Sequence, residues 1–220
     1  DTVDTAPAWL PESPSQLVYQ TAGIARAPHG GLLAIGPSAL QLLDMRKGEL
    51  TPVLESADHD HLQPRVGADG TLYFIRRPHE RVRYGSQNLI LDTLAFPFRV
   101  LRALFHYLNF FSLMYTRKPL TSASGPLVEE DLKSWVIKGK RLDAEAALKK
   151  GVTVEGIPSL VPRSWQLVRR DQHGSERILA HCVACFDLGD DGSVYWSNGY
   201  GVFRRTPRGR TQVVLRDAMI

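Results

Sequence analysis

Short runs of β-branched, aromatic and aliphatic residues, bounded by Gly, Asn and Pro, recur along this chain. The clearest example is residues 191–215, where turn residues separate Val194–Trp196, Val202–Arg205 and Thr211–Leu215. This pattern predicts an antiparallel meander of short strands. Because a single meander cannot bury its faces alone, we expect it to pack against similar units.

The same pattern occurs twice more. Three aligned runs each follow a turn that contains glycine: Leu32–Ile35 after Gly31, Leu72–Ile75 after Gly70, and Val194–Trp196 after Gly192. The runs 23–27, 62–66 and 184–188 supply a first strand for each copy. A second turn glycine follows 17 residues after the first in the outer copies, at Gly48 and Gly209, but the corresponding Gly174 lies 104 residues after Gly70. The middle copy, with later strands at 165–169 and 176–179, therefore contains an 87-residue insertion, approximately 78–164, between its second and third strands.

Four strands per unit and a 39-residue period between the first two copies predict an all-β fold, a β-propeller of four-stranded antiparallel blades. The Asp-Gly-Thr/Ser-x-Tyr and Arg-x-x-x-Gly turns resemble blades of TolB-like, NHL and gluconolactonase-like propellers. The blades occupy residues 16–77 and 165–220, after an extended lead-in at 1–15 that contains Trp9.

Three blades do not close a ring. We expect either further blades beyond Ile220, in a ring of six to eight, or two copies associated as three plus three. The end at 217–220, where another first strand would begin, favours the first.

The insertion contains the most hydrophobic stretch of the chain, residues 89–116. From Phe98 onward the polar residues Arg99, Arg102, His106 and Asn109 recur at steps of three and four, which predicts an amphipathic helix with a wide apolar face. Its charges and Pro97 argue against a transmembrane span, so we expect a soluble or peripheral membrane protein. Two further helices are predicted, at Leu127–Lys138 and Leu142–Lys150. The residues predicted to bind a partner or a membrane are Phe98, Arg99, Leu101, Arg102, Phe105, His106, Leu108, Phe110 and Phe111.

The insertion also carries the basic excess of the chain. The chain is 43% hydrophobic and 23% charged, as is usual for a globular protein, and has a net charge of +4. Residues 78–164 carry 13 Lys and Arg against 8 Asp and Glu, or +5, so that the remainder carries −1. Basic residues beside a wide apolar face fit a helix on an anionic membrane surface. The simpler interpretation is a helix packed on the propeller, on a protein partner or on a second copy. Arg-aromatic runs such as Phe203–Arg205 fit strand packing, and no nucleic-acid partner is predicted.

Two short clusters could hold a metal. Asp58, His59, Asp60 and His61 offer imidazole and carboxylate groups, although neighbours on an extended chain alternate in direction and at most two would converge. Cys182 and Cys185 form one Cys-x-x-Cys without a second pair. The simpler interpretations are a solvated loop and two core thiols. These runs, the insertion and the Ser197–Gly199 turn should gather around one face of the propeller, where rigidly held loops commonly carry function.

Two functions follow from these features. The leading hypothesis is a non-catalytic propeller, with no cofactor, whose helical insertion binds a protein partner, another subunit or a membrane surface. The alternative is a gluconolactonase-like hydrolase that uses a divalent metal and has the insertion as a lid. That resemblance implies a Glu, two Asn and an Asp around the metal, but the chain has only three asparagines, and only Asn198 lies in a loop on the expected face.

Overall fold

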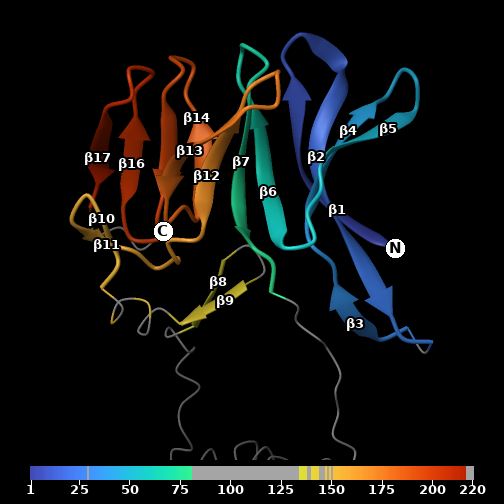
Figure 1. Ribbon diagram of the computed structural model, residues 1–220, viewed down its shortest axis with the longest axis horizontal. Helices are drawn as coiled ribbons and strands as arrows, with labels where there is room; N and C mark the ends of the chain where they lie inside the picture. Colours follow the sequence, from blue (N-terminus) through green and yellow to red (C-terminus); the bar gives the residue numbers. More distant parts are fainter. Residues whose placement is uncertain are drawn as a thin grey trace, which may run out of the picture. The chain divides into compact units, whose positions relative to one another are not determined.

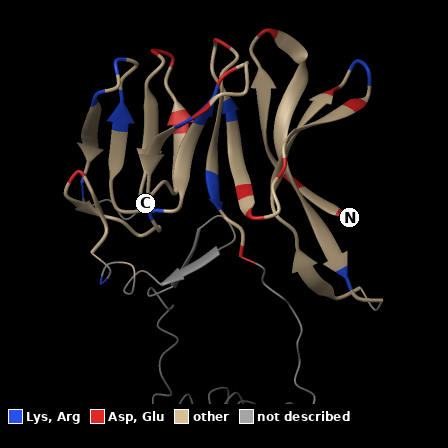
Figure 2. Ribbon diagram, in the orientation of Figure 1, with Lys and Arg blue, Asp and Glu red and all other residues tan. Residues whose placement is uncertain are grey.

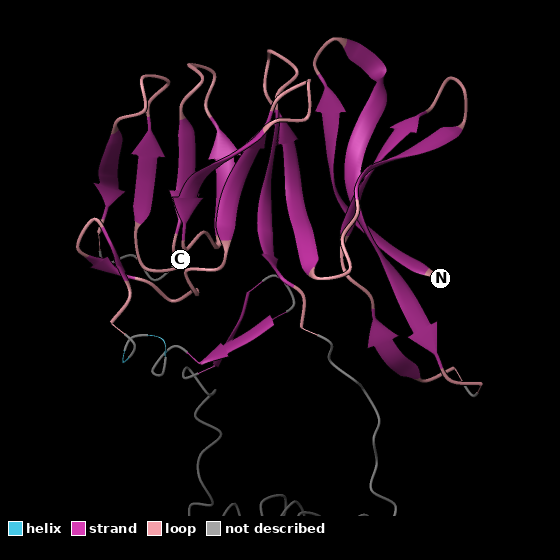
Figure 3. Cartoon of the chain, viewed as in Figure 1, coloured by secondary structure: helices cyan, strands magenta, loops and turns pink. Residues whose placement is uncertain are grey.

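The computed structural model describes residues 1–28, 30–80, 134–137, 140–143, 147, 149 and 151–216. The chain divides into one unit of residues 1–82 and 133–220 and another of residues 83–132, which lies outside the described residues. The first unit consists of antiparallel sheets (Figure 1), and strands make up nearly all of its regular structure (Figure 3). The described part of the chain is therefore all-β, as predicted.

Three large sheets follow one another along the chain. The N-terminal sheet has the order β1-β2-β4-β5, formed by Thr2–Leu10, Ser13–Arg26, Ala39–Asp44 and Glu49–Leu54, and β3 (Leu32–Ile35) pairs with the end of β2. The middle sheet has the order β6-β7-β12-β13, formed by His59–Val66, Leu72–Pro78, Gln166–Arg170 and Glu176–His181. The C-terminal sheet has the order β14-β15-β16-β17, formed by Cys185–Leu188, Val194–Ser197, Val202–Arg205 and Thr211–Leu215. Two small hairpins complete the set: β8 (Ser134–Ile137) with β9 (Lys140–Asp143), and β10 (Thr153–Val154) with β11 (Ile157–Pro158).

The middle sheet is buried on both faces, because neighbouring residues of a strand point to opposite sides. Phe74 and Val168 face the N-terminal sheet, where they pack with Val18 and Leu40. The next residue of β7, Ile75, faces the other way, into a cluster that the C-terminal sheet completes with Phe186, Trp196 and Phe203. The three sheets thus stack face to face around two hydrophobic layers, and within the described residues the outer faces of the first and third sheets lie outside both layers.

The predicted repeat matches the middle and C-terminal sheets strand for strand. β7 and β12 are neighbours and pair without a break from Leu72↔Arg170 to Arg76↔Gln166, although 87 residues, 79–165, separate them in the chain. The turn glycines Gly70, Gly174, Gly192 and Gly209 all have positive φ, which glycine adopts at little cost. β7 and β12 are therefore neighbouring strands of the middle sheet, and residues 79–165 lie between them in the chain.

The N-terminal sheet departs from the repeat. Residues 23–27 were expected as a separate first strand, but Gly23–Arg26 instead end the long strand β2, whose earlier part pairs with β4. Residues 1–15, expected as a lead-in, are extended but paired, since β1 forms an edge of this sheet. Pro7 fits this position, because an edge strand tolerates proline where one row of its backbone groups faces solvent.

Over the described residues, the helix predicted at Leu127–Lys138 is wrong, and the helix predicted at Leu142–Lys150 is correct only in part. Ser134–Ile137, inside the predicted helix Leu127–Lys138, forms β8, and the start of the predicted helix Leu142–Lys150 lies in β9. Positions 147 and 149 are helical. A run of only four residues such as Ser134–Ile137 cannot be assigned to strand or helix by its periodicity, so pairing with Lys140–Asp143 decides the outcome.

Candidate functional site

The features that the sequence analysis expected on one face are linked along one edge of the stacked sheets, which we call the insertion edge. The insertion leaves this edge after β7 and returns to it before β12 (Figure 1). Backbone hydrogen bonds join the adjoining segments: His79 N to Asp58 O, Leu160 N to Asn198 O, Val183 N to Trp165 O, and Ala184 N to Ser197 O. The segments at the insertion edge are therefore tied to their neighbours by backbone hydrogen bonds.

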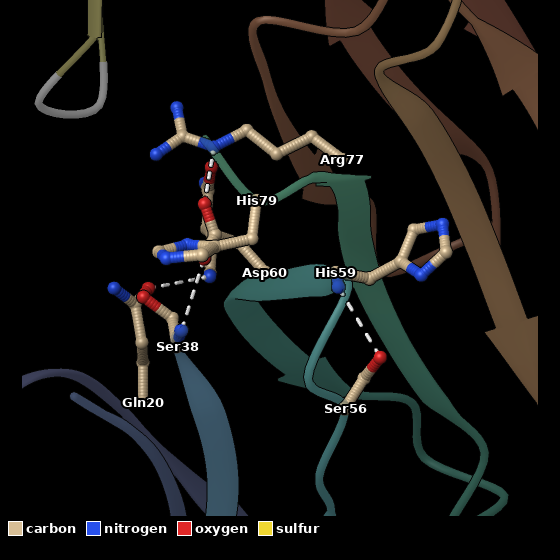
Figure 4. Close-up of polar contacts among 8 residues, drawn as sticks. Gln20, Ser38, Ser56, His59, Asp60, Arg77 and His79 are labelled. Atoms are coloured by element: carbon tan, nitrogen blue, oxygen red, sulfur yellow. Dashed lines mark hydrogen bonds and ion pairs between the residues drawn. The ribbon is translucent and has the colours of Figure 1, made fainter. Parts of the chain in front are cut away.

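At this edge the carboxylate of Asp60 is buried and surrounded by donors. Its Oδ1 accepts from Ser38 N at 3.0 Å and lies 2.8 Å from His79 Nδ1, while its Oδ2 accepts from Arg77 Nε at 2.9 Å. Figure 4 shows Arg77 and His79 converging on Asp60, whereas His59 points away. With both oxygens bonded, Asp60 serves as an anchor for its neighbours rather than as a free base or metal ligand.

Arg77 connects this anchor to the returning end of the insertion. Its guanidinium lies 4.7 Å from the ring centroid of Trp165, a cation–π arrangement, and the Trp165 side chain is completely buried. Arg77 precedes the insertion and Trp165 follows it directly. The pair therefore holds the two ends of the insertion together at the sheet.

The remaining residues of the first metal candidate diverge. Asp58 is exposed, and His59 is partly buried, with its backbone N–H bonded to Ser56 Oγ. His61 is buried with its ring edge-on to Phe74 at 5.4 Å, and this burial lowers the pKa of its imidazole below the ordinary value. No three His, Cys, Asp or Glu side chains come together as a metal site within the described ranges.

The second metal candidate is also split. Cys182 is buried, with the left-handed backbone conformation φ 59°, and burial raises the pKa of its thiol. Cys185 is exposed at the start of β14, and both cysteines are free thiols. His181 Nδ1 lies 3.1 Å from Arg163 O. The two cysteines therefore lie in different environments, one inside the core and one on the surface.

Asn198, the asparagine on the expected face, is fully buried and has a structural role. Its Oδ1 accepts from the backbone N–H groups of Tyr200 and Gly201 at 3.0 and 2.8 Å, and its Nδ2 donates to Pro158 O at 3.0 Å. The side chain fixes the β15–β16 turn against the returning end of the insertion. Its oxygen is not available as a metal ligand in this arrangement.

One cavity at the insertion edge was not predicted. It has a volume of about 260 Å³ and is lined by Arg163, Leu179, His181, Cys182, Trp196 and residues of the β10–β11 hairpin. The lining residues come from five separate segments of the chain, including Thr211, so local sequence patterns give no signal for the cavity.

The nine residues predicted to bind a partner or a membrane, from Phe98 to Phe111, lie outside the described residues. Within the described part of the chain, no helix combines the length and the apolar character that crossing a membrane requires. The chain matches no protein-family model, and no curated protein is significantly similar to it.

Proposed function

We propose that this chain is a non-catalytic interaction protein of β-propeller type, whose basic, amphipathic insertion is the binding arm. The carrying observation is the unbroken pairing of β7 with β12 across 87 intervening residues. The two strands pair through five successive positions, and Arg77 with Trp165 joins the ends of the insertion. The middle sheet is thus complete without the inserted residues.

The insertion also has an energetic cost. Closing a flexible loop of 87 residues instead of a turn of about four costs about 3 kcal/mol in chain entropy. A segment that adds this cost without completing the sheet is best explained by an activity of its own. The apolar and basic character of residues 98–111 supports binding to a protein partner, another subunit or a membrane surface.

The sequence suggests a direct test of the arm. Leu101 and Phe105 lie on the predicted apolar side of residues 98–111. Leu101→Glu and Phe105→Glu should each weaken binding at least tenfold, equivalent to about 1.4 kcal/mol, because a carboxylate would enter an apolar contact. The control Asn109→Gln should bind normally, because Asn109 lies on the polar stripe and is not one of the nine predicted binding residues.

The measurements are flotation with phosphatidylcholine–phosphatidylserine vesicles and sedimentation velocity, which report membrane binding and association respectively. Arg99→Gln with Arg102→Gln separates the outcomes, since losing these charges should reduce binding to anionic vesicles more than binding to protein. If Leu101→Glu and Phe105→Glu behave as the unmodified chain in both assays, the arm does not bind through this segment.

The metal-dependent hydrolase stays a prediction without a supporting observation in the described residues. Asp60 and Asn198, the nearest candidates at the insertion edge, already have their oxygens bonded within the protein.

A further inference from the structure

The outer face of the N-terminal sheet carries a row of apolar side chains that crosses all four strands. Trp9 pairs with Leu17, Leu17 with Leu43, and Leu43 with Leu50, so the four side chains lie in line on one face. This face is opposite the one that packs on the middle sheet, because Val18, the neighbour of Leu17, is in the core. Trp9 is 55% exposed and Leu50 is 58% exposed.

The next pair on the same face is uncharged: it is Tyr19 with Gln41, and the Tyr19 hydroxyl donates to Gln41 Oε1 at 2.9 Å. The pair beyond it, Asp4 with Thr21, brings one carboxylate to this face, where Thr21 Oγ1 donates to Asp4 Oδ1 at 2.6 Å. Figure 2 shows the charged residues of the N-terminal sheet mainly at its turns and strand ends. An exposed tryptophan in an apolar row is typical of the centre of a protein–protein interface.

The outer face of the C-terminal sheet is suited to meet such a surface. Leu215 is 48% exposed there, opposite Val202, and Val214 is 54% exposed at the register shift between Leu215 and the core residue Val213. The charged side chains of this face already have partners within the chain: Arg204 with Asp191, and Asp187 with Arg65. Covering this face would therefore bury no unpaired charge. Burial of an unpaired charge is what makes an interface costly.

The order in which the three sheets pack indicates which outer faces would meet in a larger stack. The inner face of the N-terminal sheet packs on one side of the middle sheet, and the other side of the middle sheet packs on the C-terminal sheet. Continuing this order brings the outer face of a C-terminal sheet onto the outer face of an N-terminal sheet. We infer that two copies of this chain associate head to tail through these faces, at two equivalent contacts, and so close a ring of six sheets.

The buried surface area favours a closed ring with two contacts rather than an open dimer with one contact. A face of four strands spaced about 4.8 Å apart and about five residues long covers roughly 300 Å². One contact buries two such faces, roughly 600 Å², which is below the 1,200–2,000 Å² of a stable interface, whereas two contacts reach roughly 1,200 Å². Two-fold closure uses both open faces of each copy.

Light scattering coupled to size exclusion, over a dilution series of the 220-residue chain, tests this inference. The chain should elute at twice its mass of 24.6 kDa. Trp9→Glu and Leu50→Glu on one face, and Val214→Glu on the other, should each shift the equilibrium to the monomer by at least tenfold in dissociation constant. Leu33→Glu is the matched control, since Leu33 is also apolar and 42% exposed but lies on β3, outside both faces. Circular dichroism checks that each variant is folded.

Several results would overturn the inference. A monomer at every concentration, or a mass of three or more copies, excludes the two-copy ring. A dimer that loses stability with Trp9→Glu but not with Val214→Glu would indicate contact between two N-terminal faces instead. The two proposed contacts involve the stacked sheets and not residues 83–132. Replacing those residues with a short linker should therefore leave the dimer intact. If the linker variant is a monomer, the association depends on the insertion instead. Leu101→Glu tests the proposed binding arm separately, and it should leave this ring unchanged.

Discussion

Gln63 donates from its Nε2 to the backbone carbonyl of Phe186 at 2.7 Å, across the boundary between the middle and C-terminal sheets. The backbone N–H of the same residue donates to Gln20 Oε1 at 3.1 Å, in the N-terminal sheet. Gln63 lies at a register shift of β6 and has φ 51°, a conformation that turns its groups toward both neighbours. One residue thus joins all three sheets by hydrogen bonds.

Gln63→Leu should destabilise the fold by about 1–3 kcal/mol, because it leaves the buried Phe186 carbonyl without its donor. The measurement is urea-induced unfolding followed by circular dichroism. The control Gln212→Leu changes an exposed glutamine on β17 and should alter the free energy of unfolding by less than about 0.5 kcal/mol. Equal effects of the two substitutions would mean that the link between sheets adds no stability.

Asp60→Asn should be more damaging than Gln63→Leu. The substitution removes the negative charge beside Arg77, whose side chain is only 11% exposed, and so leaves a buried cation without a counter-charge. Loss of one partner of a buried ion pair typically costs about 3–5 kcal/mol. Thermal unfolding at neutral pH measures this loss. Asp1→Asn, which affects an exposed partner of Arg26, is the matched control and should cost less than about 1 kcal/mol.

His61 should make the fold less stable in mild acid. Burial lowers the pKa of its imidazole in the folded state, so between the unfolded value near 6.5 and the lower folded value the unfolded chain binds more protons. Stability then falls as the pH decreases through this window, by at most about 1.4 kcal/mol per pH unit. The difference in unfolding free energy between the unmodified chain and His61→Gln should change with pH from 7 to 5. A constant difference would contradict a buried neutral His61.

The two cysteines should differ in reactivity. Cys182 is 1% exposed and burial raises the pKa of its thiol, whereas Cys185 is exposed. Because the thiolate is the reactive form, a thiol reagent such as DTNB should modify one thiol rapidly in the native protein and both in urea. Cys185→Ser should abolish the rapid phase, and Cys182→Ser should leave it. Protection of both thiols by added zinc would instead support the Cys-x-x-Cys metal site.

The sequence was most informative where the repeat is regular. Turn glycines such as Gly70 and Gly192 require positive φ, and the aromatic and β-branched runs after them form strands that can pair only in a few ways. This regularity made the β7–β12 neighbourhood predictable over 87 residues. The prediction from sequence failed in residues 1–26, because the pairing of β1 and the length of β2 depend on tertiary packing rather than on local turn signals.

The candidate site was less predictable than the fold. The sequence identified Asp60 but not its role, because its partners Ser38 and Arg77 are far from it along the chain. The two cysteines look equivalent in the motif, yet the left-handed backbone at Cys182 turns one inward. Such contacts depend on how sheets stack, a property that no short window of sequence contains.

The stacked sheets should fold without the inserted unit. The urea unfolding curve tests this in a variant in which a short Gly-Ser linker replaces residues 83–132, a deletion that keeps the buried residues Ile157, Leu160 and Val161. We expect one cooperative transition, with an unfolding free energy equal to that of the full chain or higher by up to about 1 kcal/mol, since the loop to be closed is shorter. The absence of a cooperative transition would mean that the sheets need the inserted unit in order to fold.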